Sequence, residues 1–223
     1  MKNALIISGG SLDLEFAAGF LKEHTYDMVI AVDSGLQAAL ELGISVHAAV
    51  GDFDSVDPEV YRSFQNQKGI LWDIHKPEKD ETDTELAVTT ALKAGCQHIT
   101  MLGALGGRFD HALGNIHLLY YIKTHGAEGE ILDSQNRITV LMEGRRFCRE
   151  KLWGKYVSFL PLTFQVTGIT LQGFRYPLYK RDISIGPCLC ISNELSEEEA
   201  VIQFEEGVLI CVESKDKTGL EEK

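Results

Sequence analysis

Ala48-Ala49-Val50-Gly51-Asp52-Phe53-Asp54-Ser55 is the stretch that shows how this chain builds its fold. Three apolar residues run into a glycine, and two carboxylates at positions i and i+2 follow at once. A short apolar run of this kind predicts a buried strand of a parallel sheet. Strand alternation then points both carboxylates the same way and turns Phe53 aside. We therefore expect a buried strand that ends in an acidic loop.

The two carboxylates predict a chemistry as well as a turn. Two anions held this close repel, and each raises the pKa of the other unless a cation lies between them. A hard divalent cation such as Mg²⁺ uses oxygen ligands of this kind and often brings substrate phosphates with it. A pair of this length is also common in acidic loops that bind nothing, so the rest of the chain decides between the two readings.

The chain around this stretch alternates short apolar runs with helical patterns as far as about residue 125. Thr82 and Glu85 have the spacing of a capping box at the start of one helix. Strands that alternate with helices predict βαβ units and a parallel sheet, and hence the α/β class. The predicted strands are residues 4–7, 28–32, 48–50, 70–74 and 99–102, and the predicted helices are residues 36–42, 84–93 and 110–124.

The pattern changes beyond residue 130, where strand-like runs follow one another between turn residues and no long helical pattern remains. This half is predicted to be a small antiparallel sandwich or barrel. We place the boundary near residue 130, with one domain over residues 1–130 and a second over 131–223. The predicted strands of the second half are residues 137–142, 156–160, 165–171, 187–191, 200–204 and 208–213.

Composition excludes several classes of protein. The 33 acidic residues outnumber the 21 basic ones, and the net charge of −12 argues against nonspecific binding to nucleic acid or to an anionic membrane. A phosphate substrate would need bound cations to enter such a protein. The amino terminus has too short an apolar run for a signal peptide, and no segment approaches the length of a membrane span. We therefore expect a cytoplasmic protein.

Polar residues that suit a metal–nucleotide site follow four of the predicted strands. Ligands bind outside the carboxyl ends of the strands in open parallel sheets, so these loops are expected to meet in one crevice. No G-x-x-x-x-G-K-[ST] and no G-x-G-x-x-G occurs, which excludes a P-loop enzyme. The four loops are Asp33-Ser34-Gly35, Gly51-Asp52-Phe53-Asp54-Ser55, Lys79-Asp80-Glu81-Thr82-Asp83 and the glycine-rich run from Gly103 to His111.

Each loop suggests a role. Asp52, Asp54 and Asp83 are the candidate Mg²⁺ ligands. Asp83 also begins a helix, where its charge suits the helix dipole, so a simple helix cap is the alternative. The glycines after residue 102 let the backbone approach a ligand, and the next helix offers N–H groups to phosphate. Arg108 adds a cation with bidentate geometry, unless it is an ordinary surface arginine beside a glycine turn.

These loops, taken in order, resemble the motifs of the thiamine pyrophosphokinase family, particularly its bacterial branch. The specific blocks are Gly51-Asp52-Phe53-Asp54-Ser55 and Gly106-Gly107-Arg108-Phe109-Asp110-His111, and the similarity continues through Ser192-Asn193. The resemblance implies a Rossmann-like domain that binds ATP and Mg²⁺, followed by a β-sandwich that binds thiamine and forms a homodimer. It also implies transfer of the terminal diphosphate of ATP to the hydroxyethyl group of thiamine, at a site on the subunit interface.

The resemblance assigns roles by position. Asp52, Asp54 and Asp83 resemble the metal ligands, and with Arg108 and Asp110 they form the implied catalytic set. The implied ATP-binding residues are Asp33, Lys79, Asp80, Thr82, Gly106, Gly107 and Arg108. The implied substrate-binding residues are Asp110, His111, Asn115, Ser192 and Asn193, of which the last two would reach the partner subunit's site. Asp110 and Asp80 are both candidates for the acceptor of the alcohol proton.

Three other functions compete with this prediction. A Mg²⁺-dependent diphosphotransferase for another small alcohol, such as a hydroxymethyl pterin, would carry similar loops around the metal. A regulator that binds nucleotide or thiamine without catalysis would have little use for the full carboxylate set together with Arg108. A metal-dependent nucleotide hydrolase would not need Ser192 and Asn193. Release of AMP that depends on thiamine distinguishes the prediction from all three.

Overall fold

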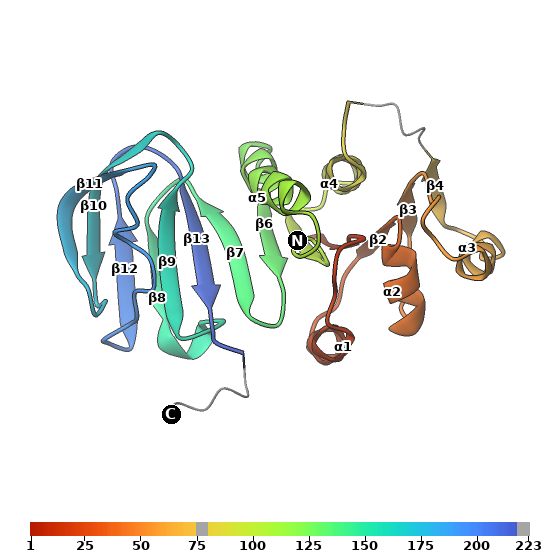
Figure 1. The fold of residues 1–223 in the computed structure, drawn as a ribbon, viewed down its shortest axis with the longest axis horizontal. Helices are drawn as coiled ribbons and strands as arrows, with labels where there is room; N and C mark the ends of the chain where they lie inside the picture. Colours follow the sequence, from red (N-terminus) through yellow and green to blue (C-terminus); the bar gives the residue numbers. More distant parts are fainter. Residues whose placement is uncertain (75–79, 218–223) are drawn as a thin grey trace. The chain divides into compact units, whose positions relative to one another are not determined.

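The computed structural model describes residues 1–74 and 80–217, which divide into two compact units, Met1–Ser134 and Gln135–Lys223 (Figure 1). The division falls at residue 134, where the sequence predicts it near residue 130. Parallel strands with helices form the first unit, and antiparallel strands form the second. The chain is therefore a mixed α/β protein. No helix within the described ranges is long and apolar enough to cross a membrane.

The first unit is built on six strands in the order β4-β3-β2-β1-β5-β6, and every neighbouring pair is parallel. The parallel sheet predicted from the sequence is confirmed, and each predicted strand is present to within one residue at either end. The last strand was not predicted. The bounds are β1 Asn3–Ile7, β2 Met28–Val32, β3 Ala48–Gly51, β4 Leu71–Ile74, β5 His98–Leu102 and β6 Glu128–Leu132.

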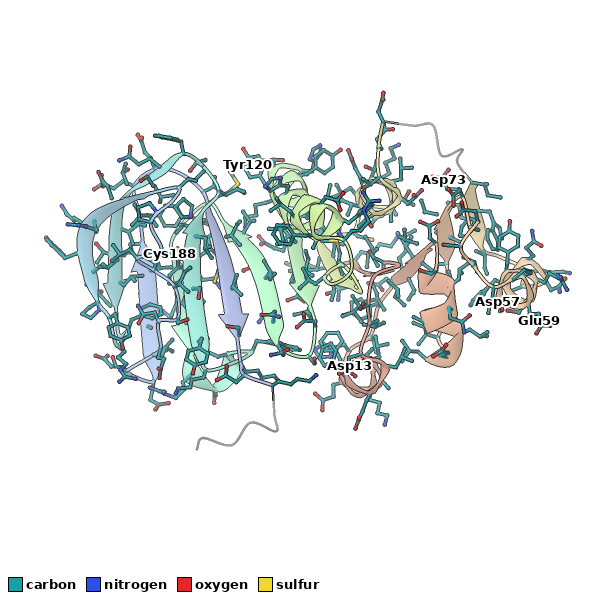
Figure 2. All side chains as sticks on the ribbon, viewed as in Figure 1. Asp13, Asp57, Glu59, Asp73, Tyr120 and Cys188 are labelled. Carbon is teal, nitrogen blue, oxygen red and sulfur yellow. The ribbon has the colours of Figure 1, made fainter. Side chains whose placement is uncertain are left out.

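Five helices connect these strands, and side-chain caps start three of them. Asp13 accepts a hydrogen bond from the N–H of Phe16 (3.0 Å), and Asp57 accepts one from Glu59 (2.7 Å); Figure 2 labels both aspartates. The Thr82 hydroxyl caps the fourth helix through the N–H of Glu85 (3.2 Å), as the sequence predicts. The helices are α1 Leu14–Glu23, α2 Gly35–Glu41, α3 Pro58–Gln65, α4 Asp83–Lys93 and α5 Phe109–Thr124.

The order of the strands places a crevice beside the central strand. From β1 the chain builds outward through β2, β3 and β4, and then it crosses to the other side of β1 to form β5 and β6. The carboxyl ends of β1 and β5 are therefore the point at which the direction of building reverses. In open parallel sheets this switch point is where ligands bind.

The second unit contains two antiparallel groups of strands around one apolar core. Phe147, Phe159 and Phe174 pack edge to face, with ring centroids 5.8–5.9 Å apart, and they come from β8, β9 and the segment after β10. The first group pairs in the order β7-β13-β9, and the second in the order β11-β10-β12-β8. The bounds are β7 Asn136–Leu141, β8 Arg145–Cys148, β9 Tyr156–Pro161, β10 Gln165–Gln172, β11 Leu178–Ser184, β12 Glu199–Gln203 and β13 Leu209–Ser214, with a short 3₁₀ helix, η1, at Arg149–Lys151.

One predicted strand of this unit is wrong. Residues 187–191 form turns and irregular backbone instead of a strand. Pro187 has no N–H to donate to a ladder, and Gly186 before it has a φ of 117°, so this segment does not extend a sheet. The strand lies earlier in the chain, at β11, whose charged residues concealed it from a search for apolar runs.

Candidate active site

A pocket of about 360 Å³ lies at the carboxyl ends of the strands of the first unit, at the switch point beside β1. Its walls come from the loops after β1, β2, β3 and β5, from the first turn of α4 and from α5. The sequence predicted that the four acidic loops would meet in one crevice, and each of them contributes at least one residue to this pocket, the loop after β3 through Ser55. The predicted site residues that line it are Asp33, Thr82, Asp83, Gly106, Gly107, Arg108, His111 and Asn115.

The remaining predicted residues lie elsewhere. Asp110 lines a neighbouring pocket of about 210 Å³ together with Thr82, His111 and Asn115. Asp52 and Asp54 follow β3, next to the main pocket rather than on its wall. Lys79 falls outside the described residues, and Asp80 lines neither pocket.

Asp33 interacts with the carboxylates of two other loops, and its pKa is raised. Burial, followed by repulsion from Asp83 and Asp52, raises its pKa to about 6, although the N–H groups of Phe53 and Asp52 act in the opposite direction. The Phe53 N–H lies 3.4 Å from Asp33 Oδ1. Three carboxylates from three different loops therefore interact, and a cation between them would relieve their repulsion.

Asp52 and Asp54 form a second pair, as the sequence predicts, but for a different reason. Because β3 ends at Gly51, the two carboxylates lie in a loop, and strand alternation does not apply to them. The left-handed φ of Phe53 (58°) turns its ring into contact with Tyr61 and Trp72, at centroid distances of 5.5 and 5.3 Å. A side-chain hydrogen bond with Asp52 and the repulsion between the two groups raise the pKa of Asp54.

Two glycines allow these loops to approach one another. A Cβ on Gly51 would lie 1.8 Å from Asp33 Oδ1, and one on Gly103 would lie 2.5 Å from the carbonyl oxygen of Ser8. Both glycines also have positive φ angles, 144° and 65°. No other residue fits at either position without moving its neighbour.

Arg108, a positively charged side chain of the site, forms an ion pair with the carboxylate of Asp110. Arg108 donates to Asp110 through Nη2 (2.5 Å) and Nε (3.2 Å), and this contact lowers the pKa of Asp110. Both side chains are exposed, and exposed ion pairs contribute little to stability. Arg108 can therefore exchange Asp110 for a phosphate at small energetic cost. Asn115, by contrast, is buried and fixes the β5 loop to α5 by donating to the carbonyl of Ala104 (2.8 Å).

The donor chemistry of this site suits Mg²⁺. Within the described residues, no three His, Cys, Asp or Glu side chains converge on one point. Protein Mg²⁺ sites commonly use one or two carboxylates and complete the octahedron with waters and substrate phosphates. The pair Asp52 and Asp54, with Asp33 and Asp83 in electrostatic contact nearby, meets that requirement.

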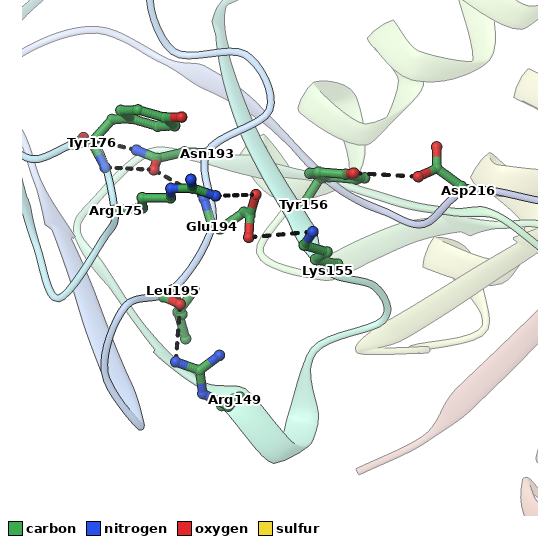
Figure 3. Close-up of polar contacts among 9 residues, drawn as sticks. All are labelled: Arg149, Lys155, Tyr156, Arg175, Tyr176, Asn193, Glu194, Leu195 and Asp216. Atoms are coloured by element: carbon green, nitrogen blue, oxygen red, sulfur yellow. Dashed lines mark hydrogen bonds and ion pairs between the residues drawn. The ribbon is translucent and has the colours of Figure 1, made fainter. Parts of the chain in front are cut away.

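Ser192 and Asn193 belong to the second unit, and Figure 3 shows the polar contacts of Asn193. Asn193 is buried, and its Oδ1 accepts from the N–H groups of Tyr176 (3.0 Å) and Glu194 (2.9 Å). Its Nδ2 donates to the carbonyl of Tyr176 (2.9 Å). Ser192 has a left-handed φ of 56°, and its N–H donates to Ser158 Oγ (2.9 Å). Contact of either residue with thiamine stays a prediction.

Sequence reasoning missed the loop directly after β1. Ser8, Gly9 and Gly10 line the main pocket, and Ser34 Oγ donates to the Gly9 carbonyl (3.1 Å). The available signal was a Ser-Gly-Gly turn after an apolar run, the same arrangement that identified the loop after β5. This loop carries no charged side chain, so a prediction based on acidic and basic loop residues does not include it.

Comparison with known proteins gives concordant matches. Residues 21–130 match the model "Thiamin pyrophosphokinase, catalytic domain", and residues 146–209 match "Thiamin pyrophosphokinase, vitamin B1 binding domain". Thiamine pyrophosphokinase of Bacillus subtilis (strain 168) is 36% identical over 217 residues, which cover 97% of this chain and 100% of that protein.

Solved structures agree. The crystal structure of thiamine pyrophosphokinase from Bacillus subtilis superimposes with a TM-score of 0.86 at 33% identity, covering 97% of this chain and 100% of that one. The thiamin pyrophosphokinase from Geobacillus thermodenitrificans gives a TM-score of 0.84 at 33% identity, covering 98% and 100%.

Proposed function

This chain belongs to the thiamine pyrophosphokinase family, and from that premise we propose that it transfers the β,γ-diphosphate of ATP to the hydroxyethyl group of thiamine, yielding thiamine diphosphate and AMP. It is a kinase-type transferase. The observation that carries the proposal is that Asp33, Asp83 and Arg108, from three loops far apart in sequence, line one pocket at the switch point of the sheet.

The proposed reaction needs positioning and charge neutralisation more than covalent chemistry. The alcohol oxygen attacks the β-phosphorus, the bond to the α-phosphate oxygen breaks, and AMP leaves. The glycine-rich loops at Gly103 and Gly106 would let phosphates approach the backbone, and Arg108 would leave Asp110 to bind them. Either Asp110 or Asp80 would accept the alcohol proton. The Arg108 contact lowers the pKa of Asp110, so Asp110 becomes a better base once that arginine binds phosphate.

We propose that Asp52, Asp54 and Asp83 hold Mg²⁺, with Asp33 beside them. The metal would supply positive charge to the phosphates and so offset the repulsion between ATP and a protein of net charge −12. The chain's own part would be to bring these carboxylates to one metal ion; in support, Asp52 and Asp83 both lie close enough to Asp33 to raise its pKa. The supporting facts are the raised pKa values of Asp33 and Asp54, because both mark carboxylates that lack a compensating cation.

The finer features of the fold and assembly are also proposals. We propose a Rossmann-like first domain and a β-sandwich second domain; the core that draws residues from both groups of strands in the second unit supports the sandwich. We also propose a homodimer in which Ser192 and Asn193 reach the partner subunit's site. Light scattering on the purified protein tests the dimer. The cytoplasm is the proposed compartment, supported by five cysteines that are all free thiols.

One assay tests the function. Purified protein with Mg²⁺ and ATP is followed for AMP release with thiamine, with a pterin alcohol and without an acceptor. AMP formed only with thiamine supports the proposal. AMP formed only with the pterin, AMP formed without acceptor, or release of ADP favours the competing transferase or hydrolase. Nucleotide binding without turnover under any condition favours the regulator.

A matched pair of variants tests the metal assignment. Asp54→Asn is expected to abolish transfer and leave the fold intact, because it removes a charged oxygen ligand from an exposed loop. Glu59→Gln makes the same change in charge at an exposed position on α3 and is expected to keep full activity. Near wild-type turnover of Asp54→Asn at saturating Mg²⁺ would refute the assignment of Asp54.

A further inference from the structure

Two buried hydroxyl groups lie next to each other on the wall of the main pocket. Ser8 directly follows β1 and is 4% exposed, and Thr84 is the second residue of α4 and is 9% exposed. Their side-chain oxygens are 3.3 Å apart, and either can be the donor. Both residues line the pocket, and neither belongs to the motifs that carry the family resemblance.

The backbone fixes both residues independently of this contact. The Ser8 N–H donates to the carbonyl of Leu102 at the end of β5 (2.9 Å). Thr84 belongs to the buried face of α4 with Ala87, Val88 and Ala91, and the Thr82 cap holds the first turn. The hydroxyl pair is therefore not what holds the strand and the helix together.

A count of the hydroxyl protons shows that one of the two donors in this pair has no acceptor among the described residues. Each hydroxyl has one proton to donate and can accept two hydrogen bonds. The contact between Ser8 and Thr84 uses one of the two protons. Neither hydroxyl has a second side-chain or backbone partner within residues 1–74 and 80–217. A buried O–H donor without an acceptor is unfavourable, and the other buried positions on this face of α4 are alanine and valine.

The surroundings define the acceptor that this donor would meet. It faces the same pocket as Asp33, Asp83 and Arg108, so a ligand there must bring anionic oxygens together with a cation. We propose that the Ser8–Thr84 pair binds a phosphate oxygen of the Mg²⁺–nucleotide: one hydroxyl donates to the other, and the second donates to the phosphate. This inference rests on the proposed function and adds two binding residues to it.

The test is calorimetric titration with Mg²⁺ and α,β-methylene-ATP, in which the bond that the reaction would break is replaced. The double variant Ser8→Ala/Thr84→Val is expected to lose about 10- to 100-fold in affinity, the range for a hydrogen bond to a charged group. Each single variant should lose less, and the losses should not add, because either hydroxyl alone can still donate. Thr84→Ser should bind within about threefold of the wild type, since the hydroxyl is kept.

Two controls separate phosphate binding from general damage to the pocket. Ser63→Ala removes a hydroxyl on α3 that donates to the Val60 carbonyl (2.7 Å), outside the pocket, and should bind the analogue as the wild type does. Adenosine has no phosphate, so its affinity should be the same for the wild type and the double variant. A folded double variant that binds the analogue within twofold of the wild type, or that loses adenosine affinity equally, would overturn the inference. Failure of the wild type itself to bind the analogue would instead count against the proposed function.

Discussion

Asn193 gives the sharpest test of how far a family motif can be carried over to this chain. The resemblance assigns it to thiamine, yet its side chain is 3% exposed and makes three hydrogen bonds within the second unit. Asn193→Ala would remove an acceptor from the N–H groups of Tyr176 and Glu194 and a donor from the Tyr176 carbonyl. At about 0.5–1.5 kcal/mol for each net hydrogen bond, the expected loss of unfolding free energy is about 2–4 kcal/mol.

Urea unfolding, followed by tryptophan fluorescence, measures this loss of stability in the second structural unit. The chain has two tryptophans, Trp72 in the first unit and Trp153 in the second, so a Trp72→Phe background makes Trp153 the only indole reporter. For a slope of about 2 kcal/mol per molar urea, the midpoint should fall by about 1–2 M, with the slope unchanged. The midpoint and the KM for thiamine should be measured on the same preparation.

Ser192→Ala is the matched comparison, because the hydrogen bond shown for Ser192 uses its backbone N–H and survives the substitution. This variant should unfold within about 0.5 kcal/mol of the wild type, as surface substitutions usually do. If Asn193→Ala leaves the urea midpoint unchanged and raises only the KM for thiamine, then the side chain serves the substrate directly, and the structural argument for Asn193 is refuted.

Two further predictions concern a glycine and a thiol. Gly103→Ala should lose about 2–4 kcal/mol of unfolding free energy, because it places a side chain at a φ of 65° and a Cβ 2.5 Å from the Ser8 carbonyl oxygen. The control is Gly43→Ala, which has the same φ but nothing within 4 Å of the added Cβ, and it should lose only about 1–2 kcal/mol. Equal losses in urea unfolding would show that the close approach contributes nothing. Burial raises the pKa of the Cys211 thiol to about 12, so at pH 8 a thiol reagent should label the exposed Cys188 and spare Cys211 until the chain unfolds; rapid labelling of Cys211 in the native protein would contradict this.

The strands that an apolar run alone identifies are those buried on both faces. In β1, β2 and β3 nearly every residue is apolar and buried, so an apolar run is sufficient to find them. The strands β8 and β11 are the two edges of their sheet and carry charged residues, and both were missed. An edge strand is defined by the neighbour it pairs with, and its own residues need not be apolar.

The two missed helices have a related explanation. The apolar faces of α1 and α3 are small, with one buried residue in α1 and two in α3. Their clearest signals were the caps, Asp13 before α1 and Asp57 followed by Pro58 before α3. A search that starts from capping residues finds these helices, whereas a search for long apolar periodicity does not.

The candidate site was predictable where its residues are charged and follow apolar runs, because parallel strands bring such loops to one edge. What the sequence did not supply was conformation. Among the described residues, the only non-glycine positions with positive φ are Asp33, Phe53, Lys180 and Ser192. Two of these are predicted site residues, and Phe53 lies between two more.

Left-handed backbone at non-glycine positions costs about 1–3 kcal/mol each, and a fold retains it only where the surroundings determine it strongly. At Phe53 the aromatic contacts with Tyr61 and Trp72 hold the ring, and at Asp33 the N–H of Phe53 bonds to the carboxylate. The two strained residues, Asp33 and Phe53, therefore lie in the two loops that carry the clustered aspartates, and the hydrogen bond between them connects these loops. If these positions only ended a strand, glycine or a relaxed turn would be sufficient. The two strained conformations therefore favour a binding function for the acidic loop that follows β3, over an acidic loop that binds nothing.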